Sequence, residues 1–121
     1  MKGKRMEKEN NRLLEACLGK AQNLVNMVEY ANDSIVSKTI LDKTAGSITL
    51  FAFDKGQKLS EHTSPYDAVV QVLDGNAQIN IGGENNNVSS GEIIIMPANI
   101  PHSVTANEKF KMLLIMIRTK G

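Results

Sequence analysis

The sequence predicts an all-β fold, a single antiparallel β-barrel preceded by a short helical extension. After Asn32 the chain consists of short runs rich in Ile, Val, Thr and Phe, bounded by Gly, Pro, Asn and Asp, a pattern typical of strands joined by turns. The intervals between these runs leave no room for crossover helices, so the strands must pair antiparallel. The 121 residues suffice for one sizeable core. We therefore expect residues 31–121 to form one domain, built as two packed sheets or as a barrel.

Residues 1–30 are expected to form an N-terminal extension that is partly helical or disordered. From Glu7 to Tyr30 the apolar residues recur at spacings of three and four, as on one face of a helix. The first twelve residues carry almost nothing apolar to bury, so we expect the beginning of this helix to fray.

Within the barrel the expected strands are 34–41, 46–53, 67–73, 76–82, 92–96, 102–106 and 110–118, with a further short piece at 87–89. The last strand is continuously apolar from Met112 to Ile117, which predicts burial on both faces. Met112, Leu114 and Met116 alternate onto one face of it. Either a partner subunit in a homodimer or the N-terminal helix must cover the other face.

Composition excludes several classes of protein. Fourteen basic against thirteen acidic residues, with only three Phe and two Tyr, give neither the positive field nor the stacking platform of a nucleic-acid-binding protein. No apolar run is long enough to span a membrane, and no apolar segment of signal-peptide type follows the basic start. The single cysteine, Cys17, excludes an internal disulfide and fits a reducing compartment. We expect a cytoplasmic protein without nucleic-acid or membrane partners.

The only two histidines lie in two segments that are bounded by glycine and contain proline. Gly56 precedes His62 and Gly75 follows it, and the second segment runs from Gly91 to His102 and beyond. Each segment is an extended piece that carries one imidazole, with glycines where tight turns are needed and prolines confined to strand edges and loops.

The first segment resembles the first motif of the cupin family of small β-barrels. That motif runs glycine, five residues, His-x-His, three or four residues, glutamate, six residues, glycine. Here Gly56, His62 and Gly75 match, whereas Ser64 stands in place of the second histidine and Ala68 in place of the glutamate.

The second segment resembles the second cupin motif, which runs glycine, five residues, proline, x, glycine, two residues, histidine, three residues, asparagine. Gly91, Pro97 and His102 match, whereas Asn99 replaces the glycine and Ala106 the asparagine. The resemblance covers residues 34–118 and implies a jelly-roll barrel.

In that family a divalent metal is typically held by three histidines and the glutamate. Two imidazoles alone make a weak site, because stable sites take three or four protein ligands. The resemblance therefore implies at most a weakly held Zn, Ni, Fe or Mn at His62 and His102.

Substitute ligands are hard to find near the first motif. Glu61 points away from the face of His62 by strand alternation, and Asp67 has the same problem relative to position 68 unless a bulge re-aims it. Tyr66 and Gln71 lie near enough to lean in, but neither is a usual metal ligand.

The predicted function is the binding of a small molecule in a pocket formed by His62, Ser64, Ala68, His102 and Met112. The alternative is a metal-dependent isomerase or oxygenase that completes the shell of the two histidines with solvent or other ligands. A third hypothesis makes Ser64 a nucleophile activated by His62, with Asp67 nearby, but the chain lacks the G-x-S-x-G elbow. The residues leave open whether the protein is an enzyme and which ligand it takes.

Overall fold

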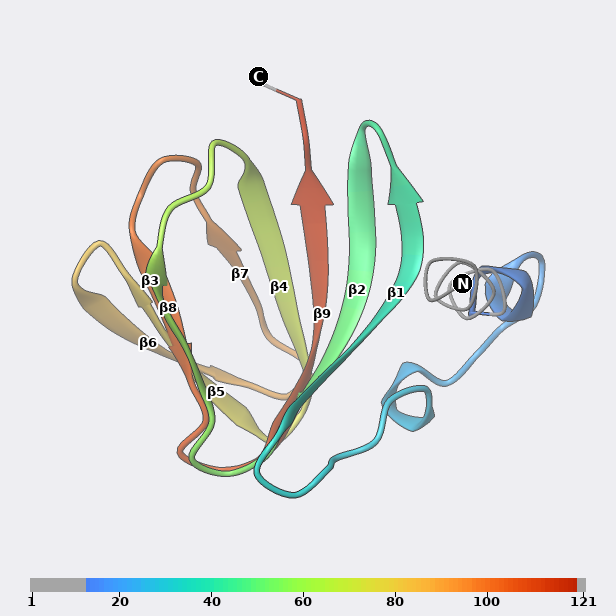
Figure 1. Ribbon diagram of the computed structural model, residues 1–121, viewed down its shortest axis with the longest axis horizontal. Coiled ribbons are helices and arrows are strands. Elements are labelled where there is room, and N and C mark those ends of the chain that lie inside the picture. The colour runs from blue at the N-terminus through green and yellow to red at the C-terminus, as the bar shows by residue number, and fades with distance from the viewer. Residues whose placement is uncertain (1–12, 120–121) are drawn as a thin grey trace, which may run out of the picture.

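The computed structural model describes residues 13–119 and shows two antiparallel sheets packed face to face (Figure 1). The larger sheet has five strands in the order β1-β2-β9-β4-β7, and the smaller has four in the order β3-β8-β5-β6. The strands are β1 (Ile35–Lys43), β2 (Gly46–Phe53), β3 (Lys58–His62), β4 (Asp67–Asp74), β5 (Asn76–Ile81), β6 (Glu84–Ser89), β7 (Ile93–Met96), β8 (His102–Thr105) and β9 (Phe110–Ile117). The all-β jelly-roll prediction is confirmed.

Every strand expected from the sequence is present, and the short piece expected at 87–89 is the end of β6. Strand β3 was not expected from the sequence, because only Leu59 in it is apolar and most of its residues are exposed. Gly75, between β4 and β5, has a φ of 74°, and a Cβ there would collide with the carbonyl oxygen of Lys109. The last glycine of the first motif is therefore required by the tight crossing between the sheets.

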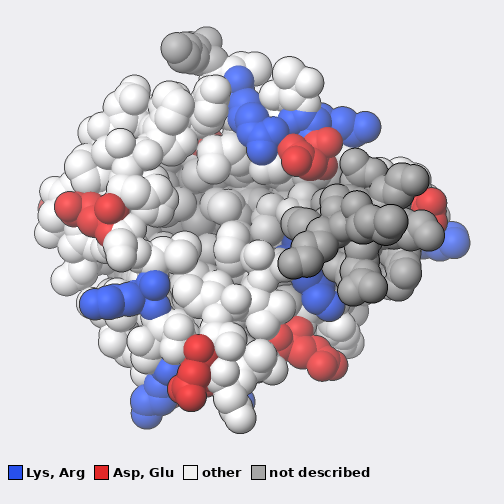
Figure 2. Space-filling view, viewed as in Figure 1, with Lys and Arg blue, Asp and Glu red and all other residues white. Residues whose placement is uncertain are grey.

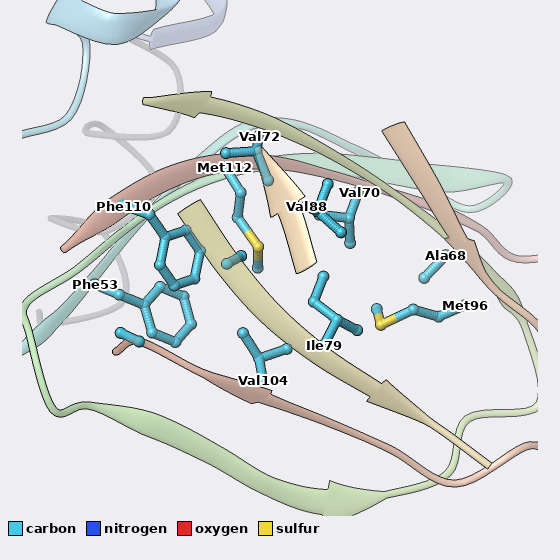
Figure 3. Packing of buried hydrophobic residues seen from close by; sticks show 12 residues of the cluster. Phe53, Ala68, Val70, Val72, Ile79, Val88, Met96, Val104, Phe110 and Met112 are labelled. Carbon is cyan, nitrogen blue, oxygen red and sulfur yellow. The ribbon is translucent and has the colours of Figure 1, made fainter. Parts of the chain in front are cut away.

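The space between the sheets is filled by inward-facing apolar side chains, as strand alternation requires. On β9 these are Met112, Leu114 and Met116, while Leu113 and Ile115 face the other way. Phe53 and Phe110 are stacked with their ring centroids 4.5 Å apart. Figure 3 shows this ring pair at one end of the cluster and Ala68 with Met96 at the other. The fully or nearly buried members are Phe53, Ala68, Val70, Val72, Ala77, Ile79, Val88, Met96, Val104, Ala106, Phe110 and Met112.

The outer face of the larger sheet is covered by residues 13–30, which we call the N-terminal arm (Figure 1). Val28 is completely buried against a second apolar cluster that contains Leu50 and Leu113. The sequence left two possible covers for the outer face of β9, a partner subunit and the chain's own N-terminal segment. The N-terminal segment covers at least part of this face. Partly buried members of this cluster are Cys17, Leu24, Met27, Tyr30, Val36, Ile48, Leu73 and Ile115.

The helical spacing of apolar residues over 7–30 is followed by helix in only part of the described residues. Helix is present at 13–17 and a 3-10 turn at Leu24–Asn26, with irregular chain between them. Gly19, at a φ of 67°, follows the helical turn in the left-handed conformation that commonly ends a helix. The apolar residues of the arm therefore contact the larger sheet from an irregular chain and do not form one face of a helix.

Polar contacts fasten the end of the arm to the sheet. The Tyr30 hydroxyl donates to Asp74 Oδ2 at 2.6 Å, and Lys111 Nζ donates to the Val25 carbonyl oxygen at 2.6 Å. The ammonium groups of Lys109 and Lys111 each lie 5.0 Å from the centre of the Tyr30 ring. Burial and the neighbouring Asp74 carboxylate both disfavour the tyrosinate, and they raise the pKa of Tyr30 well above its usual value.

The surface leaves part of the larger sheet uncovered. Ile93 and Ile95 on β7 are 65% and 55% exposed, and Ile117 at the end of β9 is also exposed. Charged side chains lie around the periphery of the face seen in Figure 2, and the described side chains at the centre of that view are uncharged. Within residues 13–119, none of the helical segments has the length and apolar character needed to cross a membrane.

Candidate functional site

Strands β3 and β8 bring the two histidines together. His62 and His102 are direct cross-strand partners, and their ring centroids lie 4.4 Å apart in an edge-to-face arrangement. The His102 side chain is 4% exposed, whereas His62 is exposed at the rim. Ile81 on β5, the other cross-strand neighbour of His102, packs against the inner cluster. The pair therefore stands at one end of the barrel interior, which we call the open end.

Each imidazole uses its Nδ1 to contact a backbone carbonyl two residues earlier in the chain. The distances are 2.8 Å from His62 to the Ser60 oxygen and 3.2 Å from His102 to the Ile100 oxygen. A carbonyl oxygen only accepts, so we assign the ring proton to Nδ1 in both residues. In the neutral form, each Nε2 then carries a lone pair that can accept a hydrogen bond or bind a metal.

The larger sheet contributes Ala68 and two methionines to the same end. Ala68 on β4 is 1% exposed and has Met96 on β7 and Met116 on β9 as its cross-strand partners. The hydroxyl of Ser64, two residues after His62, points at Met116 Sδ from 4.0 Å. Met116 was not among the pocket residues predicted from the sequence, although it lies on the same inner face of β9 as Met112.

Met112 is the methionine assigned to the pocket from the sequence. It precedes Met116 on β9 and lies two inward-facing positions away from it. It is 1% exposed and pairs with Phe51 on one side and Val72 on the other. It packs in the same cluster as Phe53 and Phe110. Met112 therefore lies in the closed part of the core (Figure 3), and Met116 is the β9 methionine of the open end.

Two hydrogen bonds donated by backbone N–H groups join the motifs to each other. The N–H of Asn99 donates to the Ser64 carbonyl oxygen at 2.7 Å, and the N–H of Ala98 donates to Asp67 Oδ1 at 2.8 Å. Asn99 has a φ of 66°, a conformation that asparagine tolerates better than most residues. This explains how asparagine can occupy the glycine position of the second motif.

The acidic and amide candidates near the first motif do not add a third ligand. The Asp67 carboxylate is engaged with the loop after β7. Gln71 pairs with Leu113, whose side chain belongs to the outer cluster, so Gln71 faces outward. Among the described residues, His, Cys, Asp and Glu form no group of three or more that could hold a metal ion.

The nucleophile hypothesis also lacks its geometry. The Ser64 hydroxyl oxygen accepts a hydrogen bond from the N–H of Tyr66 at 3.2 Å, and the hydroxyl points at the Met116 sulfur. The Nδ1 atom of His62 contacts the Ser60 carbonyl oxygen, and Asp67 is bound to the Ala98 amide. The orienting acid and the base that a triad requires are therefore not aligned on Ser64.

Comparison with known proteins decides the family. Residues 49–118 match the family model described as "Cupin domain", which covers both histidines and both motifs. This chain belongs to the cupin family.

Related structures agree with the fold. A protein of unknown function from Streptococcus pyogenes is 39% identical, with a TM-score of 0.79 over 84% of this chain and 90% of that chain. A cupin 2 conserved barrel domain protein from Leptotrichia buccalis is 43% identical, with a TM-score of 0.78, over 80% of this chain and 47% of that one. An uncharacterized protein of Streptomyces coelicolor is 31% identical over 60% of this chain and 68% of its own length.

The residues present supply only two of the four ligands typical of a cupin metal site. The described open end offers two imidazoles, with alanine at the position of the cupin carboxylate and serine at that of one histidine. The side chain of Ala68 is buried between two methionines, so no carboxylate has room to enter there without displacing them. A divalent ion at this place would keep its full charge without an anionic ligand.

Proposed function

We propose that this cupin binds a small organic molecule at the open end of its barrel, with His62 and His102 as polar anchors on an apolar wall. The observation that carries the proposal is the cross-strand imidazole pair, in which both Nδ1 atoms are committed to backbone carbonyls. Ligand pockets typically combine an apolar lining with a few fixed polar groups. Ala68 and Met116 supply apolar lining beside Ser64.

The donor and acceptor pattern defines the class of ligand. Two neutral imidazoles present Nε2 lone pairs, so the ligand should carry hydroxyl or N–H donors. An apolar body should face Met96 and Met116, because thioether side chains adapt their shape to a ligand. We therefore expect a hydroxylated or amino-substituted apolar compound rather than an anion such as a phosphate ester.

The test is a ligand screen by NMR on metal-free protein, using phenols, catechols and aliphatic alcohols against their methyl ethers. Donor-bearing compounds should shift the amide signals around His62 and His102, and the ethers should bind at least about tenfold more weakly. His102→Ala should abolish these shifts, whereas Gln71→Ala on the outer face should leave them intact. Equal binding by alcohols and ethers would overturn the assignment of the imidazoles as anchors.

The second candidate function is a metal-dependent isomerase or oxygenase. It is favoured by the position of both histidines at cupin motif positions and by their free Nε2 atoms. Elemental analysis of protein purified without a histidine tag tests it. A stoichiometric divalent metal that survives dialysis would put this candidate first.

A homodimer is part of the proposal. The N-terminal arm covers the centre of the outer face, but Ile93, Ile95 and Ile117 are still exposed, and exposed apolar patches commonly mark contacts between proteins. Sedimentation at micromolar concentration should give twice the monomer mass. Replacement of Ile93 and Ile95 by Ser should shift the protein toward monomer.

A cytoplasmic location completes the proposal. The one cysteine, Cys17, is free in the structure, as expected in a reducing compartment. Fractionation of the source cells should recover the protein with cytoplasmic markers.

A further inference from the structure

The smaller sheet ends in a strand that lacks the usual protections of a sheet edge. Strand β6 pairs with β5 only, and within residues 13–119 no strand lies against its other edge (Figure 1). Six consecutive residue pairs join β6 to β5 without a bulge. The strand contains no Lys and no Pro, and its one charged residue is Glu84 at its first position. Its outer edge is therefore open to pairing with another strand.

The other sheet edges are protected. Strand β1 has a register shift between Thr39 and Leu41 and carries charged side chains. Strand β3 has a register shift between Leu59 and His62 and is also charged. Strand β7 has only four residues. Bulges, charges and shortness each discourage edge-to-edge pairing, so β6 differs from the other three edge strands.

The hairpin turn before β6 determines which of its backbone groups face the open edge. Gly82 and Gly83 have φ values of 58° and 92° and form a two-residue turn, as in type I′. Such a turn closes on a hydrogen-bonded pair of flanking residues, and bonded and non-bonded pairs then alternate along the hairpin. Every second residue of β6, beginning with Asn85, therefore directs its N–H and C=O away from β5.

The outward-facing residues are Asn85, Asn87 and Ser89. The Ser89 N–H donates to Glu92 Oε1 at 2.7 Å, which agrees with its facing away from β5. No side chain of the described residues accepts the N–H of Asn85 or Asn87 in the same way. The open edge of β6 thus presents the N–H and C=O groups of these two asparagines.

We propose that β6 pairs antiparallel with β6 of a second copy of this chain, about a two-fold axis at Asn86. In this register Asn85 lies opposite Asn87 of the second copy, and Asn87 lies opposite Asn85 of the second copy. Four hydrogen bonds then use all the open groups. A shift of two residues would require either the bound N–H of Ser89 or the turn residue Gly83. A shift of one residue would bring opposite faces of the two sheets together.

The side chains of β6 fit the same register. On the outer face Asn80 Nδ2 donates to Asn85 Oδ1 at 2.9 Å, which leaves the Asn85 NH₂ group to extend this row of amides to Asn87 of the second copy. Glu84 lies opposite Val88 of the second copy. The two Glu84 carboxylates are then about 14 Å apart along the strands, beyond the screening length of about 8 Å. No like charges oppose the pairing.

This interface is separate from the ligand site and from the homodimer proposed above, which buries the outer face of the larger sheet. Four backbone hydrogen bonds between polar strands bury little area, so the association should be weak.

Strands β5 and β6 offer a matched pair of variants. Asn87 and Gln78 are cross-strand partners on the same outer face. Asn87→Lys puts a charge on the open edge, whereas Gln78→Lys puts the same charge one strand further in. Both side chains lie opposite the apolar inner face, so both variants should fold.

The experiment is sedimentation equilibrium from about 10 µM to about 1 mM. The apparent mass of the parent protein and of Gln78→Lys should rise toward twice its micromolar value, and that of Asn87→Lys should not. Ile93→Ser with Ile95→Ser should lower the micromolar mass without removing this rise, so the two interfaces can fail independently.

Hydrogen exchange over the same range locates the contact. The amides of Asn85 and Asn87 should exchange at least about threefold more slowly at the higher concentration, because pairing protects them. The amide of Asn86 already faces β5 and should not change. Equal association of the two lysine variants would overturn the proposal, as would exchange at Asn85 and Asn87 that does not depend on concentration.

Discussion

The two ends of the barrel interior differ although one strand, β9, lines both. At the closed end Phe110 and Met112 are almost completely buried, and Phe110 stacks on Phe53. At the open end Met116 is only partly buried, and His62 is exposed. The difference indicates that packing constrains residue identity strongly at one end of the strand and less at the other, where the proposed site lies.

The largest expected effect lies at the closed end. Phe110→Ala should lower the free energy of unfolding by about 3–5 kcal/mol, because it opens a cavity beneath a stacked ring. His62→Ala removes an exposed imidazole and its contact with the Ser60 carbonyl, and should cost about 1 kcal/mol or less. Urea denaturation of both variants measures the contrast. Similar losses would mean that the open end contributes to stability as much as the core does.

Restoring the cupin ligands should have the next largest effect. Ser64→His with Ala68→Glu should cost about 1–3 kcal/mol without metal, because the new carboxylate must displace the methionines beside Ala68. Saturating Ni²⁺ or Zn²⁺ should recover about 2.7 kcal/mol at a hundred times the dissociation constant.

Calorimetric titration and thermal melts with and without metal measure this recovery. The parent protein should bind either divalent ion weakly, so its melting temperature should move little. Failure of the double variant to gain affinity would show that positions 64 and 68 do not converge with the histidines as they do in other cupins.

The same contrast between ends explains what the sequence could predict. The strands and the histidine pair follow from alternation and from two spaced motifs, both of which are local in the chain. Alternation along β9 places both Met112 and Met116 on the inner face. It does not tell which of the two is more deeply buried, because that depends on how the two sheets pack against each other. Strand β3 was missed because it forms by pairing with β8 rather than by burying apolar residues.

The N-terminal arm shows a similar limit. Its spacing of apolar residues fits a helix, yet the sheet beneath it offers a broad apolar surface that an irregular chain covers better. Tertiary contacts therefore overrode the local pattern. The contacts that hold the arm leave no local signal in the sequence, because they join distant residues, such as Tyr30 and Asp74, which are 44 positions apart.

A smaller effect is expected at the hydrogen bond between Tyr30 and Asp74. Tyr30→Phe should cost about 1 kcal/mol near neutral pH. The raised pKa of Tyr30 means that alkali ionises this residue in the unfolded chain before it does so in the folded one. Its contribution is complete below the ordinary tyrosine pKa of about 10 and declines as the pH rises above that value.

Denaturation at a series of pH values from neutral to strongly alkaline tests the direction of this pH dependence. The parent protein should lose more stability than Tyr30→Phe as the pH rises, so the two curves should converge. Parallel curves would show that the hydroxyl is as free to ionise in the folded protein as in the unfolded chain.

The smallest effect is expected from deletion of residues 1–11, which lie outside the described residues. Apart from Met1 and Met6 this segment holds only glycine, charged and asparagine side chains, so little apolar area is available to stabilise any contact. The deletion should change the melting temperature by about 2 °C or less. Extending it through residue 30 removes Val28 and Tyr30, exposes the outer cluster over Leu50, and should cost several times more. A drop of many degrees from the short deletion would show that the first eleven residues make contacts that their composition does not predict. A tolerated long deletion would instead show that the outer face of the larger sheet can be covered without the arm.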